Sequence, residues 1–432
     1  MSATLAERRA AVRRDLKHPP KPVVAEHPAP RPGKLRLARN TAADEPDVDE
    51  VSRRDPYRRR QVRQIHRHSG PIPGSVYVIG SIVALLTLVG LVMVLSASSV
   101  SLVHDGLSPW AYFVRQLLWA VIGTIALVTT MRVPYQRWRS WVRPALGVSY
   151  GLMVLPFIPG IGLSRNGARA WAQIGPIGFQ PSEFLKLAVV LYCADLLTKR
   201  EDRMHLVRST MVPCLVVLGV SSAFMLAQGD LGSAVVLAAV VLAMVFVGGA
   251  PLAPLAGSAA GMAALSMVFV YSKPYRRNRW TAFLDLAKNK TDTAYQVWQA
   301  LVGISDGGVT GVGFGASRAK WGRLPLAHSD FIFAIVAEEL GLIGVVAILG
   351  CYLVFAFFGL KIALASADRF GMLIAGGVTA WIAVQAIINV GGVTGMMPLT
   401  GLTLPFMSFG GSSLFVVMTA AGLLLSVARS SA

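Results

Sequence analysis

Residues 75–97 read SVYVIGSIVALLTLVGLVMVLSA and contain no charged side chain. A bilayer core about 30 Å thick needs roughly 20 apolar residues in a helix that rises about 1.5 Å per residue. This stretch therefore predicts a transmembrane helix, and it is the first of a series. Similar apolar runs lie at 111–131, 142–160, 181–198, 209–227, 231–249, 253–272, 331–358, 371–395 and 405–428. We expect an all-α polytopic membrane protein with about ten transmembrane helices.

The charged residues divide the chain into two parts. Only 15% of the 432 residues are charged, against about 25% in soluble domains. Residues 1–70 nevertheless hold 17 Lys and Arg and 9 Asp and Glu, without a sustained apolar run. This composition is typical of disordered chain, so we expect a basic cytoplasmic tail at 1–70 and a membrane domain at 71–432. The arginines within 58–67 either bind anionic lipid or only orient the protein.

The short loops carry an orientation signal. An even number of helices places both termini on one side of the membrane. The loops at 132–143, 199–208 and 359–371 hold ten basic residues, whereas the loops that alternate with them hold two. Because basic loops stay in the cytoplasm, we expect both termini to be cytoplasmic.

One long connection departs from this rule. Residues 273–330, between the expected seventh and eighth helices, fall on the outer side yet carry nine basic and four acidic residues. Connections of this length are usually functional or disordered, and the tryptophans in this one favour short helices on the outer surface. Its glycines at 307–315 either let the backbone approach a ligand closely or form a flexible loop.

Ionisable residues near the outer rim are the candidates for chemistry. Asp330 ends the long loop, where a carboxylate can meet both a membrane-embedded substrate and water. Ser329 or Asp330 is equally a good N-cap for the eighth helix, so the residues alone leave capping and catalysis both open. Deeper in that helix, Glu338 and Glu339 either form a proton path or pair with a basic side chain.

Other polar features lie on the same side of the membrane. Glu183 and Lys186, three residues apart, share a helix face and either line a substrate cavity or neutralise each other. The turn at 228–232 and the segment 398–413 are rich in Gly, Pro and Ser, which suits backbone that lines a cavity or close helix packing. No metal-ligand spacing, catalytic triad, phosphate-binding loop or disulfide framework is present in the sequence.

These features together resemble a known family. The segments 166–171 (NGARAW), 180–186 (QPSEFLK), 228–232 (QGDLG), 295–333, 338–341 (EELG) and 398–413 match, in order and spacing, the SEDS family of bacterial cell-wall polymerases, of the FtsW/RodA type. The resemblance covers about residues 75–428, and residues 313–320 favour the FtsW branch. The sequence departs from the family pattern at Ala170, Gly229 and Ser329.

The resemblance implies a peptidoglycan glycosyltransferase. It would polymerise lipid II, an undecaprenyl-diphosphate-linked disaccharide-pentapeptide, on the outer face of the bacterial cytoplasmic membrane during division or elongation. Asp330 falls on the family's essential acidic position and would act as the catalytic base. The residues expected to bind or surround the substrate are Arg169, Trp171, Glu183, Lys186, Arg276, Lys320, Arg323, His328 and Ser412.

The resemblance also bears on cofactors and partners. A divalent cation could take part in the reaction, but the isolated carboxylates assign it no site. The expected partners are a class B penicillin-binding transpeptidase, other divisome or elongasome membrane proteins and membrane lipid, and no nucleic acid is expected. Two other functions fit ten helices with a polar interior: a lipid II flippase, and a non-catalytic scaffold that recruits the transpeptidase.

Overall fold

The computed structural model describes residues 73–165, 168–175, 177–204, 206–272, 274–292 and 294–430. The tail expected at 1–70 lies outside these residues. Within the described chain, one helix occupies each of the ten predicted apolar runs. They are α4 (Gly74–His104), α5 (Ala111–Arg132), α6 (Val142–Val154), α7 (Pro181–Lys199), α8 (Val207–Ala227), α9 (Leu231–Val247), α10 (Leu252–Tyr271), α13 (Ile332–Leu364), α14 (Arg369–Val393) and α15 (Gly411–Ser430).

These helices differ in length and polarity. Seven helices of the described chain are long and apolar enough to cross a membrane, namely α4, α5, α8, α10, α13, α14 and α15. Two more, α9 and α6 with the turn η2 (Leu155–Phe157), are apolar but shorter. Helix α7 carries ionisable side chains at both ends. The prediction of a polytopic, mainly helical membrane protein is confirmed.

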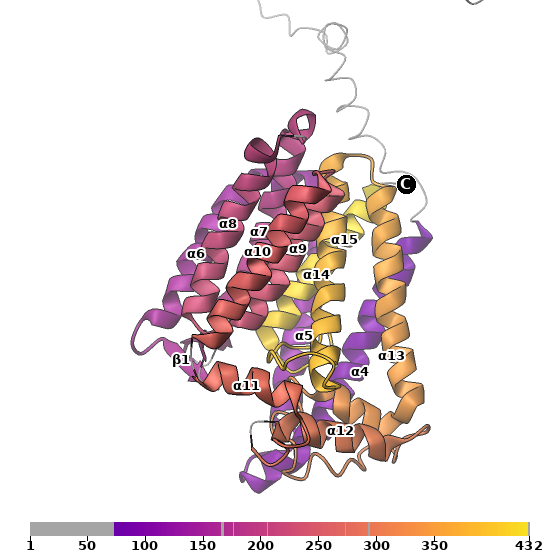
Figure 1. Cartoon of the computed structure of the whole chain (residues 1–432). Coiled ribbons are helices and arrows are strands. Elements are labelled where there is room, and N and C mark those ends of the chain that lie inside the picture. The colour runs from indigo at the N-terminus through magenta and orange to yellow at the C-terminus, as the bar shows by residue number, and fades with distance from the viewer. Residues whose placement is uncertain are drawn as a thin grey trace, which may run out of the picture. The chain divides into compact units, whose positions relative to one another are not determined.

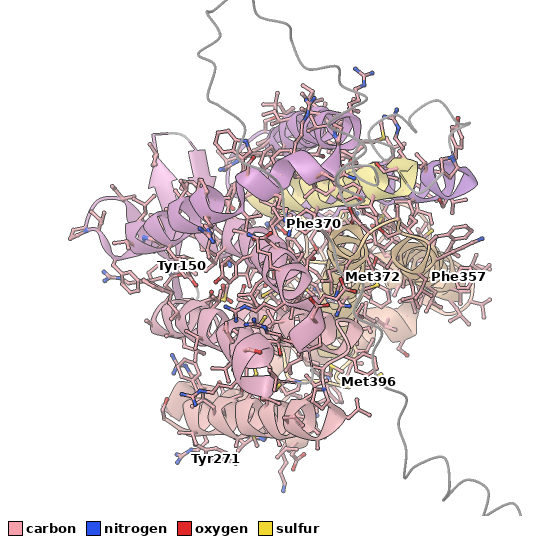
Figure 2. All side chains as sticks on the ribbon, turned by 90° about the horizontal axis from the view of Figure 1, so that it is seen from above. Tyr150, Tyr271, Phe357, Phe370, Met372 and Met396 are labelled. Atoms are coloured by element: carbon pink, nitrogen blue, oxygen red, sulfur yellow. The ribbon has the colours of Figure 1, made fainter. Side chains whose placement is uncertain are left out.

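Burial is uneven among the helices. The apolar part of α15 is 83% buried inside the protein, whereas that of α10 is 6% buried. Small residues allow close contact in the centre: a Cβ on Gly422 of α15 would lie 2.9 Å from the Leu127 Cα of α5, which is the packing expected where backbones approach within a membrane. Seen along the bundle in Figure 2, Tyr271 and Phe357 lie at the periphery and Phe370 lies in the interior.

The connection between α6 and α7 contains a small sheet that the all-α prediction omits. Strands β1 (Gly162–Arg165), β2 (Ala168–Ile174) and β3 (Ile177–Phe179) form an antiparallel sheet in the order β1-β2-β3. Trp171 pairs with Leu163, and Ala172 pairs with Phe179. The strands are too short for a clear alternation of polar and apolar residues, which is the usual sequence signal for a strand.

The long connection between α10 and α13 contains two short helices, as predicted. They are α11 (Pro274–Leu284) and α12 (Tyr295–Gly307). The remaining short turns of the described chain include η1 (Tyr135–Ser140) and η3 (Glu201–Arg203). Figure 1 shows β1, α11 and α12 at one end of the helix bundle and the C-terminus at the opposite end. The polar segments singled out in the sequence therefore gather at one end.

Candidate active site

Helix α13, which follows Asp330, is broken near its start. At Gly341 the backbone has φ 65° and ψ −163°, far from helical values. The loop segment 308–313 supplies main-chain hydrogen bonds on both sides of the break. These bonds run from the N–H groups of Val312 and Gly313 to the carbonyl oxygens of Glu338 and Glu339 (2.9 and 3.2 Å), and from the N–H groups of Leu342 and Ile343 to the carbonyl oxygens of Gly308 and Val309 (2.9 and 3.2 Å).

The glycines of the long loop make this docking possible. A Cβ on Gly307 would overlap the carbonyl oxygen of Ala337, and a Cβ on Gly311 would overlap that of Glu339. Gly311 also has a φ of +81°, which favours glycine. The close approach that the glycines predict is observed, and the group approached is the backbone of α13.

Glu338 fastens the next part of the loop to the same helix. Its carboxylate accepts hydrogen bonds from the Ser317 hydroxyl at 2.5 Å and from the Arg318 N–H at 2.6 Å. The Ala319 N–H lies 3.3 Å from the same carboxylate. Since Glu338 is buried, these donors replace the water that a carboxylate needs when it is removed from solvent. Of its two predicted roles, the observed contacts favour an anchor.

Lys320 is placed differently from its assignment as a substrate-binding cation. Its side chain is buried, and Nζ donates to Glu339 Oε1 at 3.1 Å, Ser96 Oγ at 3.0 Å and the Gly315 carbonyl oxygen at 2.6 Å. An ammonium group has three donors, and these acceptors use all of them. The assignment is corrected accordingly: Lys320 pairs with α13 and has no donor left for a diphosphate.

Asp330 lies directly before α13, but it does not hold the capping position. The helix begins at Ile332 and its N-cap is Phe331, whose side chain makes no capping hydrogen bond. Ser329 donates its hydroxyl to the Leu326 carbonyl oxygen at 3.3 Å. The expectation that Ser329 or Asp330 is the N-cap is therefore corrected.

The surroundings of Asp330 come from α14 and from the loop 394–410 that joins α14 to α15. The Asn389 side-chain amide donates to the Asp330 carbonyl oxygen at 2.9 Å and to the Leu402 carbonyl oxygen at 2.6 Å. On the same loop, a Cβ on Gly401 would lie 3.5 Å from the Asp330 carboxylate. Asp330 is half-buried, and the glycine leaves open space beside its carboxylate.

A buried polar network continues from this loop into the bundle. One turn before Asn389 on α14, the Gln385 amide donates to the Thr403 carbonyl oxygen at 3.0 Å, and its oxygen accepts a hydrogen bond from Lys186 at 3.0 Å. Lys186 forms an ion pair with Glu183 at 2.8 Å, and both side chains are buried. The pair therefore neutralises itself and is also linked to the loop that faces Asp330.

The starts of α7, α9 and α15 meet in the same region. The Gln180 N–H donates to Ser412 Oγ at 3.1 Å, and the Gln180 side chain donates to Asp230 at 2.8 Å. Asp230 caps α9 by accepting the Ser233 N–H at 2.9 Å. Ser412 is buried, so its observed contact is with protein backbone.

His328 belongs to an aromatic cluster. Its ring centroid lies 4.8 Å from that of Tyr112 on α5 and 5.5 Å from that of Phe409, and the His328 carbonyl oxygen accepts the Phe409 N–H at 3.0 Å. Burial lowers the pKa of His328 from its ordinary 6.5 to about 4. A neutral imidazole packed between two rings fixes the long loop to the loop 394–410.

The predicted arginines lie on separate elements. Arg169, on β2, has an exposed side chain, and its N–H donates to the Gln228 carbonyl oxygen at 2.8 Å. Arg276, on α11, stacks over the Phe269 ring of α10 at 3.7 Å, and desolvation lowers its pKa. Arg323 is exposed, and Trp171 is half-buried on β2.

Two residues of the network were not predicted. Gln385 and Asn389 are single amides in an apolar run, so composition gives them little weight. Their spacing of four residues places them on one face of α14, and a pair of polar side chains on one face of a membrane helix is the signal that would have found them.

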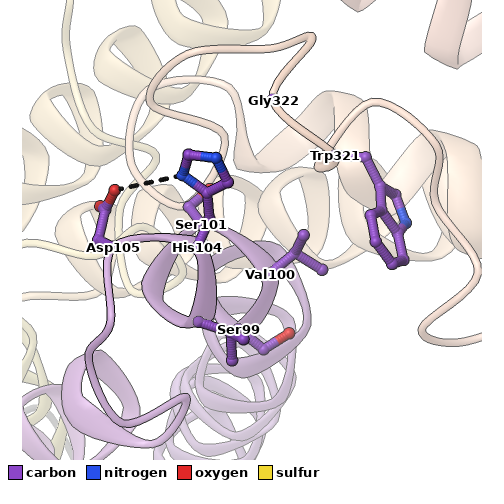
Figure 3. Close-up of a pocket in the computed structure, with 8 residues that line it drawn as sticks. Ser99, Val100, Ser101, His104, Asp105, Trp321 and Gly322 are labelled. Atoms are coloured by element: carbon purple, nitrogen blue, oxygen red, sulfur yellow. Dashed lines mark ion pairs between the residues drawn. The ribbon is translucent and has the colours of Figure 1, made fainter.

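A separate cavity of about 720 Å³ lies at the end of α4 beside the long loop. Figure 3 shows His104 and Asp105, whose Nδ1 and Oδ1 atoms are 3.7 Å apart, and Trp321 across from them. None of the predicted site residues lines this cavity, so we keep the candidate site at Asp330. Within the described residues, no group of three His, Cys, Asp or Glu side chains could hold a metal ion.

The apolar helices with a polar network at one end define a polytopic membrane protein with a site built from a long loop and three helices. The family model described as "Cell cycle protein" (FtsW, RodA, SpoVE) matches residues 77–432. The chain belongs to this family, and the predicted family resemblance is confirmed.

Individual relatives agree with this assignment. A probable peptidoglycan glycosyltransferase FtsW of Trichlorobacter lovleyi is 41% identical over 351 residues, which cover 80% of this chain and 91% of that protein. Stage V sporulation protein E of Bacillus subtilis is 40% identical over 350 residues, with 81% and 95% covered.

Solved structures share the fold. A chain from a study of a peptidoglycan synthase complex that coordinates polymerization and crosslinking matches with a TM-score of 0.68 and 30% identity, over 83% of this chain and 97% of that chain. The crystal structure of the rod shape determining protein RodA of Thermus thermophilus matches with a TM-score of 0.60 and 30% identity, over 82% and 96%.

Proposed function

We propose that this peptidoglycan glycosyltransferase polymerises lipid II with Asp330 as its general base. Family membership and relatives named as probable peptidoglycan glycosyltransferases support the enzyme class. The observation that carries the role of Asp330 is its position. It lies at the start of α13, its main chain is held by Asn389, and its carboxylate faces a glycine.

The proposed reaction is a single displacement. The 4-hydroxyl of an acceptor lipid II gives its proton to the Asp330 carboxylate, while its oxygen attacks the anomeric carbon of the terminal sugar of the growing chain. The bond to the lipid diphosphate breaks, and the diphosphate leaves with the bonding electrons. Cations placed before the reaction stabilise the charge that develops on the leaving group, and we assign this role to Arg276 and Arg323.

The proposal includes an orientation and a partner. With both termini in the cytoplasm, as the basic short loops favour, residues 273–330 lie on the outer face and the tail at 1–70 lies inside. The partner we propose is a class B penicillin-binding transpeptidase, in company with other division or elongation proteins. The likeness to a chain from a peptidoglycan synthase complex supports an assembly of this kind.

The test is glycan synthesis from fluorescent lipid II in detergent by the full-length protein purified with its transpeptidase. We expect glycan from the wild type and none from Asp330→Asn. The matched control is Asp285→Asn, because Asp285 belongs to the same long loop and forms an ion pair of 3.2 Å with Lys288 near the surface.

Each contrary result points elsewhere. If Asp330→Asn polymerises as fast as the wild type, the assignment of the base is wrong. If folded wild type makes no glycan, polymerisation is wrong and a flippase or a scaffold takes its place, because detergent micelles have no second leaflet across which lipid could be moved.

A further inference from the structure

The break in α13 separates a short helical segment from the rest of the helix. Residues 332–340, which directly follow Asp330, are joined to the remainder of α13 only through the non-helical Gly341. The direction of this segment is therefore not set by the membrane-spanning part of α13. It is set by what packs against it, and the segment 308–320 of the long loop supplies those contacts.

The strongest of these contacts is a buried ionic cluster. Lys320 and Glu339 pair at 3.1 Å, with side chains 4% and 0% exposed. The same carboxylate oxygen accepts the Ser96 hydroxyl at 2.6 Å, so the cluster also joins α4. Beside it, Glu338 accepts the Arg318 N–H. Loop, short helical segment and first apolar helix thus meet at one pair of opposite charges.

We infer that Lys320 and Glu339 are positioning residues for Asp330, because their ion pair fixes the direction of the short helical segment that Asp330 precedes. The inference rests on the proposed role of Asp330. It gives Lys320 a task that acts through another residue. A displacement of about 1 Å in a catalytic group lowers a rate by about 10²-fold, so loosening this pair should slow the chemical step and leave substrate binding intact.

The test uses the difference between breaking a buried ion pair and removing it. Lys320→Met leaves the Glu339 carboxylate buried without its counter-charge, which is strongly destabilising locally. Lys320→Met combined with Glu339→Gln leaves two uncharged groups of similar size, which is far better tolerated. Lys288→Met is the matched control, since Lys288 is an exposed lysine of the same long loop.

Two measurements are made on the full-length protein with its transpeptidase. In glycan synthesis, we expect Lys320→Met to lower kcat by about 10²-fold with KM for lipid II unchanged, and the double variant to recover most of kcat. In hydrogen–deuterium exchange, we expect residues 312–320 to exchange faster in Lys320→Met and to return toward the wild-type rate in the double variant. Lys288→Met should change neither.

The outcomes separate this inference from the alternatives. If KM rises in Lys320→Met and the double variant remains inactive, Lys320 binds the diphosphate and the inference is overturned. If exchange of 312–320 is unchanged in Lys320→Met, the ion pair does not hold the loop and the inference is equally overturned. If wild type makes no glycan, the proposed function fails, while the exchange result still decides whether Lys320 holds the loop.

Discussion

Replacing Gly311 with alanine should loosen the loop that fills the break in α13. Gly311 lies where the segment 308–313 passes directly over the helix backbone. A Cβ there would overlap the Glu339 carbonyl oxygen and lie 2.7 Å from the Leu340 carbonyl carbon. Neither atom can move without disturbing α13, so the loop has to move away.

The cost can be worked out against a matched glycine. Gly311 and Gly315 have φ values of +81° and +78°, and alanine in this left-handed region costs about 1–2 kcal/mol. A Cβ on Gly315 meets nothing within 4 Å, so Gly315→Ala should cost only this amount. Gly311→Ala also weakens the two main-chain hydrogen bonds that follow it across the break, at about 1 kcal/mol each. Its total is about 3–4 kcal/mol.

The assay is denaturant unfolding in detergent micelles, followed by tryptophan fluorescence, with the two variants and wild type prepared in parallel. Gly311→Ala should lose roughly twice as much stability as Gly315→Ala or more. Equal losses in the two variants would refute the reasoning, because the backbone contact that distinguishes them would then contribute nothing.

Two further predictions concern residues near Asp330. Burial lowers the pKa of His328 to about 4, so between pH 6.5 and 4 the unfolded chain takes up a proton that the folded chain resists, and stability falls as the pH falls. His328→Phe keeps the ring packing and should flatten this dependence in unfolding measured from pH 7 to pH 4; coincident profiles would contradict it. Asn389→Leu frees the Asp330 and Leu402 carbonyl oxygens and should lower kcat for glycan synthesis by about 10-fold or more, a result that unchanged kcat would exclude.

The helices were predictable because hydropathy reports which segments lie in lipid. It reports helix ends less well. The run at 75–97 predicts the apolar part of α4, which continues as helix to His104, since serines and histidine remain helical beyond the hydrocarbon. The break at Gly341 left no trace in hydropathy, because the residues on both sides are apolar and the pattern contains no information on φ and ψ.

The candidate site was predictable where a charge stood out from apolar surroundings. Asp330 and the pair of Glu183 and Lys186 were found in this way, and the pair is three residues apart on one helix. The partner of Lys320 was not predictable, because Glu339 comes next to it only when the loop folds back over α13. A lysine in a basic loop looks the same in sequence whether it faces solvent or a buried carboxylate.

The break in α13 also bears on how the chain is assembled during synthesis. The groups that complete the break, in residues 308–313, are translated before α13 itself. Unpaired main-chain groups are costly in hydrocarbon, and contacts between neighbouring stretches of sequence form with little loss of chain entropy. We expect α12, the loop and the start of α13 to enter the membrane as one folded unit, onto which α14 and α15 are then added.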